Sequence, residues 1–519
     1  MTKYFASLLL FLVAWPSFAA DQNGYTAKYE CRAGNPNCNV DVATLVAQAC
    51  QQTITTSTTP TNDWSAINWA NTVICIEAGD HTARGLLTLG ASGTAGTRKI
   101  LRYVRTSDNN DDPWNQSDAN KAKIADFECF EKDYWIIQRL TFWRTNGNEF
   151  FRNAGCKYMV YERMLVDGRD LNPTSTGKPL WLIKGIAPNY VSSDFTTVQN
   201  SVVRGSGKLT NADNPCINQG GPDVRIVNNE IYNCGGDAIV LDTGSRPYRS
   251  VMENNDLYQT IDYYINCDGT PATPGGNNHC SCGEDAIDLK SNDTTNPANG
   301  IEIIHNRMWG WRTTYQSCGG TGSFGFGVNS GSGDPKRYVQ VRDNIIMDIS
   351  NGISLSPPTS NWTVSGNILY DVSHAHTSQD FLANSDAENS VAIRFGGGSN
   401  HKVYLNTIAN SKYALVLASS AANNLLQCNV FLNLQGIKRH FGENWASSSI
   451  STNNAFYATP AFTTTTSSNN IILPAVSDAK MSTYSFQRKL LTKPELMQLD
   501  FTRPSTSSPH YTACQLTLN

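Results

Sequence analysis

Seven asparagines repeat along the chain, and each stands directly before a short run of strand-forming residues. They are Asn229, Asn255, Asn306, Asn344, Asn367, Asn406 and Asn429. The successive spacings are 26, 51, 38, 23, 39 and 23 residues, so the short ones match one coil and the long ones a coil plus a loop. Short strands that return at such a period predict a solenoid. Asparagine suits the turn because it tolerates a left-handed backbone and can bond to its counterpart in the next coil.

A second kind of strand recurs between these turns. It occupies residues 238–242, 286–290, 352–356, 392–396 and 414–418. Successive side chains of a strand point to opposite faces, and one face of each of these strands is uniformly apolar. That face predicts the interior of a parallel sheet. The outward positions differ from coil to coil and include Asp288, Lys290 and Arg394, which we expect to form a ladder on one exposed face.

The two sets of strands predict an all-β protein folded as a right-handed parallel β-helix (solenoid) over residues 71–435. Residues 71–103 already contain short strands separated by glycine-containing turns. Residues 21–70 have a mixed composition and are predicted to form an N-terminal cap. Residues 436–519 lack the repeat and are predicted to form a C-terminal capping segment.

The first 20 residues have the pattern of a secretory signal peptide. Lys3 precedes an apolar run over residues 4–14, and small residues stand at the expected cleavage site near Ala19. No other segment approaches the roughly 18 uncharged apolar residues that a membrane span needs. We therefore expect a secreted or periplasmic protein with no membrane partner.

The chain has 14 cysteines, and in an exported protein these favour disulfides over a thiolate metal site. Cys31 with Cys38, and Cys216 with Cys234, are close enough in sequence to be partners. The remaining connectivity does not follow from the sequence.

The formal net charge is −4, so bulk electrostatic attraction does not favour polyanions. We expect no nucleic-acid partner and a monomeric protein. An anionic ligand would need a local site or a bridging cation.

Acidic residues gather on two aligned strands. The segment 283–291 repeats the pattern of 236–242, with Asp237 aligned to Asp285 and Val240 to Asp288. Carboxylates on neighbouring coils repel unless they are protonated or bridged by a cation, and Ca²⁺ accepts six to eight oxygen ligands. We expect Asp237, Glu284, Asp285 and Asp288 to converge on one calcium ion. Asp237 and Asp285 share the parity of the inward residues, so the turn before each strand must redirect them.

These motifs resemble the parallel β-helix polysaccharide lyases, most nearly the calcium-dependent pectate-lyase-like branch. In that family an "Asp-Gly-Phe" strand is followed by "Asp-Asp-Gly-Phe/Trp-Asp" and then by "Gly-Phe-Lys-Leu-Gly-Gly". The acidic residues of the first two motifs bind calcium, and the lysine of the third removes a proton from the sugar. By motif, Asp237 corresponds to the first aspartate, while Glu284, Asp285 and Asp288 correspond to the acidic residues of the second. Arg394 corresponds to the lysine. The resemblance implies calcium-assisted β-elimination on a uronate polysaccharide.

The base has two candidates, Arg394 and Lys290. Related lyase families use arginine at this position, but a guanidinium stays charged in almost any setting and is a poor base. Lys290 is chemically easier, although an ion pair with Asp288, two residues before it, would raise its pKa. Either residue can instead clamp the substrate carboxylate. An ordinary surface salt bridge at Arg394 remains the structural alternative.

Three other functions remain open. A C5-epimerase shares the proton abstraction. A glycoside hydrolase of the polygalacturonase type is the second hypothesis, because residues 283–287 resemble that family's "Gly-Asp-Asp-Cys-Ile" strand, whereas 325–327 reads Gly-Phe-Gly where that family has Gly-His-Gly. The third is a binding or adhesion solenoid without catalysis.

Overall fold

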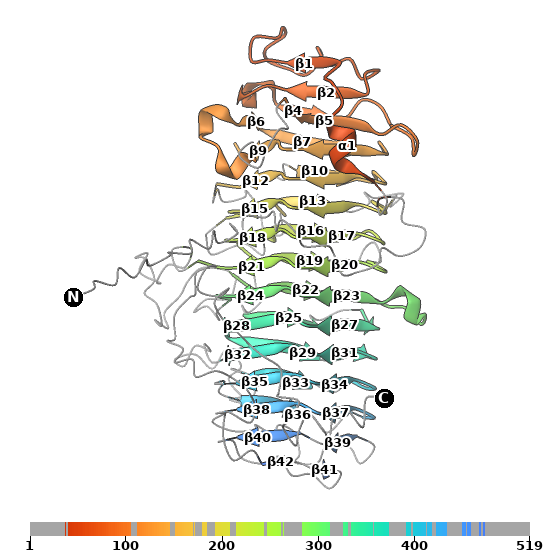
Figure 1. The fold of residues 1–519 in the computed structure, drawn as a ribbon, viewed down its shortest axis with the longest axis vertical. Coiled ribbons are helices and arrows are strands. Elements are labelled where there is room, and N and C mark those ends of the chain that lie inside the picture. The colour runs from red at the N-terminus through yellow and green to blue at the C-terminus, as the bar shows by residue number, and fades with distance from the viewer. Residues whose placement is uncertain are drawn as a thin grey trace, which may run out of the picture.

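The computed structural model describes most of the chain between residues 40 and 472. The described residues are 37, 40–104, 112–145, 151–169, 171, 179–183, 192–207, 214–242, 247–260, 263, 283–311, 325–330, 334–355, 358–372, 391–395, 398–409, 411, 413–417, 422–432, 449–452, 454–457, 467–468 and 471–472. They form a tall stack of short strands, with the N-terminal strands at one end and the C-terminal strands at the other (Figure 1). The predicted signal peptide lies outside the described residues.

Three long parallel sheets run along this stack within the described residues. Sheet A has 15 strands: β1 (Gln52–Ile54), β2 (Val73–Ile76), β5 (Lys99–Tyr103), β8 (Trp135–Gln138), β11 (Val160–Glu162), β14 (Thr197–Gln199), β17 (Arg225–Val227), β20 (Val251–Glu253), β23 (Ile301–Ile304), β27 (Val339–Arg342), β31 (Thr363–Ser365), β34 (Lys402–Tyr404), β37 (Leu425–Gln427), β39 (Ile450–Thr452) and β41 (Ser467–Ser468). Sheet B has 14: β3 (Gly79–Asp80), β6 (Ala122–Ile124), β9 (Thr141–Trp143), β12 (Leu165–Asp167), β15 (Val202–Arg204), β18 (Glu230–Tyr232), β21 (Asp256–Tyr258), β24 (Arg307–Trp309), β28 (Ile345–Ile349), β32 (Ile368–Val372), β35 (Thr407–Ala409), β38 (Val430–Leu432), β40 (Ala455–Tyr457) and β42 (Ile471–Ile472).

Sheet C has 11 strands: β4 (Leu86–Thr88), β7 (Asp126–Phe130), β10 (Phe151–Ala154), β13 (Trp181–Ile183), β16 (Ile217–Gln219), β19 (Ile239–Leu241), β22 (Ile287–Leu289), β25 (Phe326–Asn329), β29 (Asn351–Leu355), β33 (Val391–Phe395) and β36 (Tyr413–Leu417). A small parallel pair is made by β26 (Lys336–Arg337) and β30 (Thr359–Ser360). The described helices are short: α1 (Val42–Val46) and the 3-10 turns η2 (Thr82–Arg84), η4 (Pro113–Asn115), η5 (Asp118–Asn120) and η8 (Pro297–Asn299).

In the middle of the stack each coil contributes one strand to each long sheet. β17, β18 and β19 follow one another in the chain, and each pairs in parallel with the corresponding strand of the coils on either side. This is the predicted right-handed parallel β-helix. The division into caps and helix stays a prediction, and parallel pairing within the described residues extends from β1 to β42.

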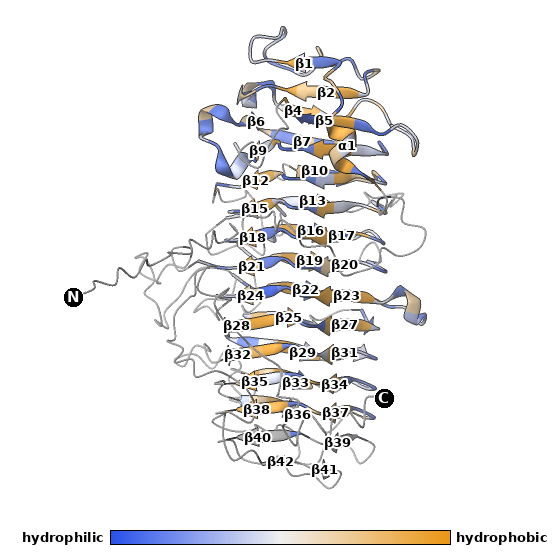
Figure 2. Cartoon of the chain, in the orientation of Figure 1, coloured by the Kyte–Doolittle hydropathy of each residue, from blue (hydrophilic) through white to orange (hydrophobic). Residues whose placement is uncertain are grey.

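The interior of the helix is filled by the apolar positions that the sequence predicted. Ile239 and Leu241 in β19, and Ile287 and Leu289 in β22, are fully buried in one continuous core cluster. Apolar residues fall on the stacked strands, whereas the η4–η5 segment beside β6 is hydrophilic (Figure 2). The alternation along each strand therefore determines which face packs inward.

The seven repeating asparagines form a hydrogen-bonded ladder between sheets A and B, confirming their structural role. In each step the backbone N–H and the side-chain Nδ2 of one asparagine donate to Oδ1 of the asparagine in the next coil, at 2.9–3.1 Å. The ladder continues beyond Asn429 to Asn454.

The left-handed backbone lies one residue earlier than we expected. The residues with positive φ directly precede the ladder asparagines: Asn228, Asn254, His305, Asp343, Gly366, Leu405 and Cys428. The ladder asparagine does not adopt this conformation itself, because its side chain and N–H are committed to the neighbouring coil.

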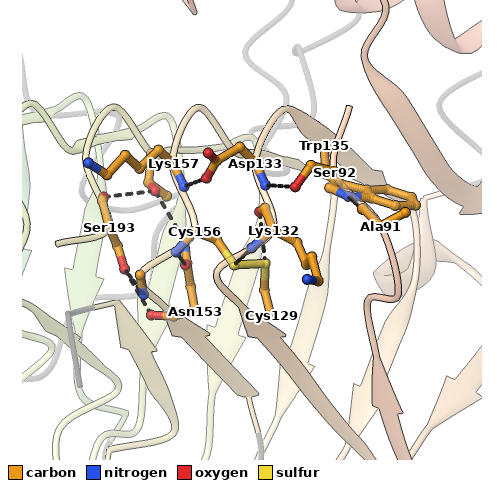
Figure 3. Close-up of a disulfide and its surroundings, with 12 residues drawn as sticks. Ala91, Ser92, Cys129, Lys132, Asp133, Trp135, Asn153, Cys156, Lys157 and Ser193 are labelled. Carbon is orange, nitrogen blue, oxygen red and sulfur yellow. Dashed lines mark hydrogen bonds between the residues drawn. A yellow bond between two sulfur atoms is a disulfide. The ribbon is translucent and has the colours of Figure 1, made fainter. Parts of the chain in front are cut away.

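Disulfides join neighbouring coils in the described part of the chain. The pairs are Cys50–Cys75, Cys129–Cys156 and Cys216–Cys234, and the last confirms a predicted pair. Figure 3 shows Cys129–Cys156 beside the turns that follow β7 and β10. Cys31 and Cys38 lie outside the described residues. Disulfides are typical of proteins that fold in an oxidising compartment, which supports the predicted export. Within the described ranges, no helix has the length and apolar character that crossing a membrane requires.

Candidate active site

The predicted acidic residues lie where the chain passes from sheet B into sheet C. Asp237 stands in the turn before β19, and Asp285 in the corresponding turn before β22. These strands are neighbours, with Val240 opposite Asp288. Asp237 therefore belongs to one coil, and Asp285 and Asp288 belong to the next.

The turns bring three carboxylates together. Ligand atoms of Asp237, Asp285 and Asp288 all lie within 4.8 Å of one another, and all three residues are fully buried. Asp237 reaches along the helix axis, since its Oδ1 accepts a hydrogen bond from the backbone N–H of Asp285 at 2.9 Å. The turn thus redirects a side chain whose strand parity alone would send it into the core.

Asp285 repeats this arrangement one coil further on. Its Oδ1 accepts the backbone N–H of Phe326 at 2.7 Å, and its Oδ2 accepts Nδ2 of Asn329 at 2.8 Å. By contrast, Oδ2 of Asp237 is buried and accepts no hydrogen bond from any described residue. A buried carboxylate oxygen in this state is costly unless a proton or a cation accompanies it.

Glu284 lies beside the cluster rather than within it. Its side chain is 5% exposed, but its carboxylate is not in the group of three that lie within 4.8 Å. Its backbone N–H donates to Gly236 O, and its carbonyl accepts from Gly325 N–H, which ties it to the coils on both sides. Its negative charge still raises the pKa of Asp237.

Burial and repulsion between carboxylates raise the pKa of two members of this cluster. Burial, followed by repulsion from Glu284, Asp288 and Asp285, raises the pKa of Asp237 well above its usual value. Burial and the charge of Asp288 raise the pKa of Asp285 to about 7, despite the hydrogen bonds from Phe326 and Asn329. The site therefore combines an ionisable group near neutral pH with a surplus of negative charge.

Lys290 faces the cluster from the same strand. Its Nζ forms an ion pair with Asp288, and its side chain is 31% exposed. Burial opposes its charge, but Asp288 and then Asp237 outweigh that effect and raise the pKa of Lys290 above its usual value. Lys290 therefore remains a cation in this arrangement, which suits a carboxylate clamp better than a base. We expected Asp288 on an exposed face, and it is buried instead.

A second lysine, Lys336, lies in this region and was not predicted from the sequence. Lys336 is fully buried in the two-residue strand β26, where its N–H donates to Pro358 O and its carbonyl accepts Nε1 of Trp362. Burial lowers the pKa of Lys336 to about 8, against the attraction of Asp288. Lys336 belongs to neither of the two repeating sets of strands, and in the sequence it is only a cation in a run of polar residues.

Arg394 stands on the outward column of sheet C but not in the cluster. Along this column the residues follow one another from strand to strand in the order Asp288, Asn329, Ser354 and Arg394. Three strand spacings of about 4.8 Å put Arg394 about 14 Å along the axis from Asp288. This agrees with the coil count that the asparagine spacing predicted.

The donor set of the cluster fits a hard divalent cation. All its candidate ligands are carboxylate oxygens, the ligand type that Ca²⁺ prefers. Oδ2 of Asp237 accepts no hydrogen bond from any described residue. The negative charges of the carboxylates around it together exceed the single positive charge of Lys290. The same geometry also fits two carboxyl groups that share a proton.

No protein-family model matches this chain, and no curated protein matches it. Among solved structures, it is similar to a mannuronic acid specific polysaccharide family 6 lyase from human gut microbiota, with 11% identity, TM-score 0.45, and coverage of 78% of this chain and 77% of that chain. It is also similar to the catalytic domain of a GH87 alpha-1,3-glucanase in complex with nigerose, with 13% identity, TM-score 0.42, and coverage of 82% and 70%. A third is the A-module of a mannuronan C-5 epimerase of Azotobacter vinelandii, with 12% identity, TM-score 0.37, and coverage of 78% and 91%. These likenesses concern the fold.

Proposed function

We propose that this protein is an exported polysaccharide lyase that cleaves a uronate-containing polymer by calcium-assisted β-elimination. The observation that supports this most directly is the buried cluster of Asp237, Asp285 and Asp288, with an Asp237 oxygen that lacks a hydrogen bond beside the cationic Lys290. The resemblance of the motifs around these residues to pectate-lyase-like enzymes agrees with it. The predicted signal peptide and the disulfides support export.

Asp237, Asp285 and Asp288 are the residues that would hold the calcium ion, with Glu284 adding negative charge from beside them. When bound, calcium neutralises the uronate carboxylate and so acidifies the proton on the neighbouring ring carbon. Lys290, which pairs with Asp288 and is 31% exposed, would bind that carboxylate.

A base of the chain takes the ring proton, and the electron pair of that C–H bond forms the new carbon–carbon double bond. The neighbouring glycosidic oxygen leaves with the electron pair of its bond to carbon and takes up a proton. Each cleavage gives one new reducing end and one unsaturated sugar at the new non-reducing end. Arg394 and Lys290 both remain candidates for the base. The raised pKa of Lys290 favours Arg394 as the base and Lys290 as a clamp for the carboxylate. The fixed charge of a guanidinium instead favours Lys290 as the base.

A glycoside hydrolase is the second candidate, and one observation favours it. Asp285, with a pKa raised to about 7, can donate a proton at neutral pH, and Asp288 lies within 4.8 Å of it. Retaining glycosidases place their two carboxyl groups about 5–5.5 Å apart. Water would then be consumed at each cleavage, and no unsaturated sugar would form.

The deciding experiment incubates the protein with pectate, alginate and chondroitin, with and without chelator. Ultraviolet absorbance reports unsaturated ends, and a reducing-sugar assay reports every new end. A lyase gives equal numbers of both and loses them with chelator. New reducing ends without absorbance indicate the hydrolase, and the absence of new ends on every polymer refutes both assignments.

Two variants connect that result to the cluster. Asp285→Asn should abolish cleavage, whereas Asp293→Asn, which neutralises an aspartate that is 55% exposed, should leave it unchanged. Calcium binding should also be measured directly by calorimetry. Because protons compete for Asp285 below its pKa of about 7, calcium affinity should be lower at pH 5 than at pH 8, and the difference should shrink in Asp285→Asn. A pH-independent affinity would argue against this site.

A further inference from the structure

A cavity of about 380 Å³ opens on the outer side of sheet B. It is lined by Trp143, Asp167, Arg169, Arg204, Gly205, Tyr232 and Asn233. Four of these residues are neighbours in register on β9, β12, β15 and β18, so the cavity spans four consecutive coils. The intervening strand residues Phe142, Val166 and Val203 point into the core, which confirms that the cavity residues face outward.

The cavity begins where an aromatic stack ends. Tyr232, Tyr258 and Trp309 stack along the axis, with ring centroids 4.8 and 4.3 Å apart and planes within 8° of parallel. The column continues toward the N-terminus with Arg204 and then Asp167, and Gly205 contributes no side chain. One face of Tyr232 thus borders the cavity, with the Arg204 guanidinium 5.9 Å from its centroid.

The far wall is an aromatic ring surrounded by cations. Lys121, Lys123 and Arg169 place their charges 5.9, 5.4 and 5.1 Å from the centroid of Trp143. Lys121 is paired with Asp118 at 2.8 Å. Across the part of the chain that the structure describes, Lys123 and Arg169 form no ion pair.

The carboxylates at the cavity are already engaged. Oδ2 of Asp167 accepts Nε and an Nη of Arg204 at 2.9 and 2.7 Å, and its Oδ1 accepts the backbone N–H of Arg169 at 2.8 Å. The other Nη of Arg204 donates to the Tyr232 hydroxyl at 2.7 Å. Among the described residues, Asp80, opposite Lys123 on the neighbouring strand, is the remaining carboxylate nearby. The described residues around the cavity thus carry a positive surplus in a chain whose net charge is −4.

We propose that this cavity binds one acidic sugar residue, carboxylated or sulfated, of a polysaccharide. Trp143 and Tyr232 supply aromatic surface for the sugar ring. Arg169 and Lys123 supply the charge for its acid group through charge-assisted hydrogen bonds. A site with this local charge is what an anionic ligand requires on a protein that does not attract polyanions in bulk.

The position of the cavity connects it to the acidic cluster. Tyr232 ends β18, and Asp237 follows in the turn of the same coil, while Tyr258 and Trp309 occupy the two coils that carry Asp285 and Phe326. A chain held in the cavity can therefore extend alongside the coils of the cluster. This inference rests on the proposed function for the identity of the polymer, but the binding itself does not require catalysis.

The test measures binding rather than cleavage. The mature protein is run by affinity electrophoresis in gels that contain alginate, chondroitin sulfate or neutral dextran, with chelator present to suppress turnover. The cavity variant is Lys123→Gln with Arg169→Gln. The control variant is Lys132→Gln with Lys402→Gln, which removes the same charge from residues that neither line the cavity, as Arg169 does, nor lie over Trp143, as Lys123 does.

We expect the parent to be retarded by an acidic polymer and not by dextran. Loss of two exposed charged contacts should weaken that binding about fivefold to tenfold, and the control should stay within about twofold. Comparing alginate with chondroitin sulfate separates a carboxylate from a sulfate ligand. Trp143→Leu should weaken binding as well, with thermal unfolding measured to confirm that the fold is kept.

Three results would overturn the proposal: a parent that binds dextran as well as the acidic polymers, a parent that binds none of them, and a cavity variant that binds like the control. The failure of the proposed function looks different. If no polymer is cleaved but the cavity variant is retarded less than the control variant, the cavity assignment stands. If a polymer is cleaved but all variants are retarded equally, the cluster assignment stands.

Discussion

Asn306 lies inside the asparagine ladder, bonded to a ladder asparagine on either side, and its replacement by alanine should destabilise the protein strongly. Its Oδ1 accepts the backbone N–H and Nδ2 of Asn255, both at 2.9 Å. Its Nδ2 donates to Met252 O and to Oδ1 of Asn344, both at 3.0 Å. Asn306→Ala removes all four bonds from a fully buried position.

The magnitude depends on which groups keep another partner. Nδ2 of Asn255 still donates to Ile226 O at 2.8 Å, and Oδ1 of Asn344 still accepts the N–H of residue 306 at 2.9 Å. The backbone N–H of Asn255 and the carbonyl of Met252 lose the side-chain partner. A buried group left without a partner costs about 1–3 kcal/mol, and each lost bond adds less, so the free energy of unfolding should fall by about 2–5 kcal/mol.

Urea denaturation followed by circular dichroism measures this change, and hydrogen exchange over residues 252–257 locates it. Asn120→Ala is the matched control, because Asn120 is exposed, and it should change stability by less than about 0.5 kcal/mol. Asn306→Asp keeps the acceptor but turns a second oxygen toward Met252 O and Asn344 Oδ1. It should destabilise at least as much as alanine, and more at high pH. A cost below about 0.5 kcal/mol for both Asn306 variants would refute the argument from the ladder.

Three further predictions concern titration, covalent bonding and the base. Burial lowers the pKa of His401 to about 3. The neutral imidazole therefore contributes stability above its unfolded pKa of about 6.5, and this contribution is lost as the pH falls toward 3. His401→Gln should flatten the decline in urea midpoint between pH 6 and pH 4. Replacing both Cys216 and Cys234 by serine should lower the free energy of unfolding by about 2–4 kcal/mol, measured the same way. Arg394→Ala should abolish turnover with calcium affinity kept, whereas Lys290→Ala should weaken substrate binding with some turnover left; the opposite pattern would make Lys290 the base.

Local periodicity was enough to predict the fold. The spacing of the asparagines and the alternation in residues such as Ile239 and Ile287 are properties of single strands and turns, and both recur over many coils. The position of the left-handed residue was wrong by one, as at Asn228 before Asn229. The sequence shows that a turn is present, but the hydrogen bonds between coils decide which residue adopts the strained conformation.

The candidate site was predictable in part, because only some of its contacts follow from strand register. The convergence of Asp237 and Asp285 depends on two turns that send each side chain to the N–H of the next coil. Strand parity gave the opposite direction. Lys336 comes from β26, outside the repeat, so no periodic argument could place it near Asp288. The coil count, in contrast, gave the separation of Arg394 correctly.

The feature that most changes the chemistry is the burial of the outward column of sheet C. Alternation predicted Asp288 on the outward face, and Asn329 and Ser354 lie in the same column, yet the exposures of these three residues are only 0%, 9% and 1%. On a solvated ladder the carboxylates would keep ordinary pKa values and bind a cation weakly. Here burial is the largest cause of the raised pKa of Asp237 and Asp285. Strand alternation distinguishes inward from outward positions, but it carries no information on what covers the outward ones, and burial of a carboxylate is what favours a proton or a cation beside it.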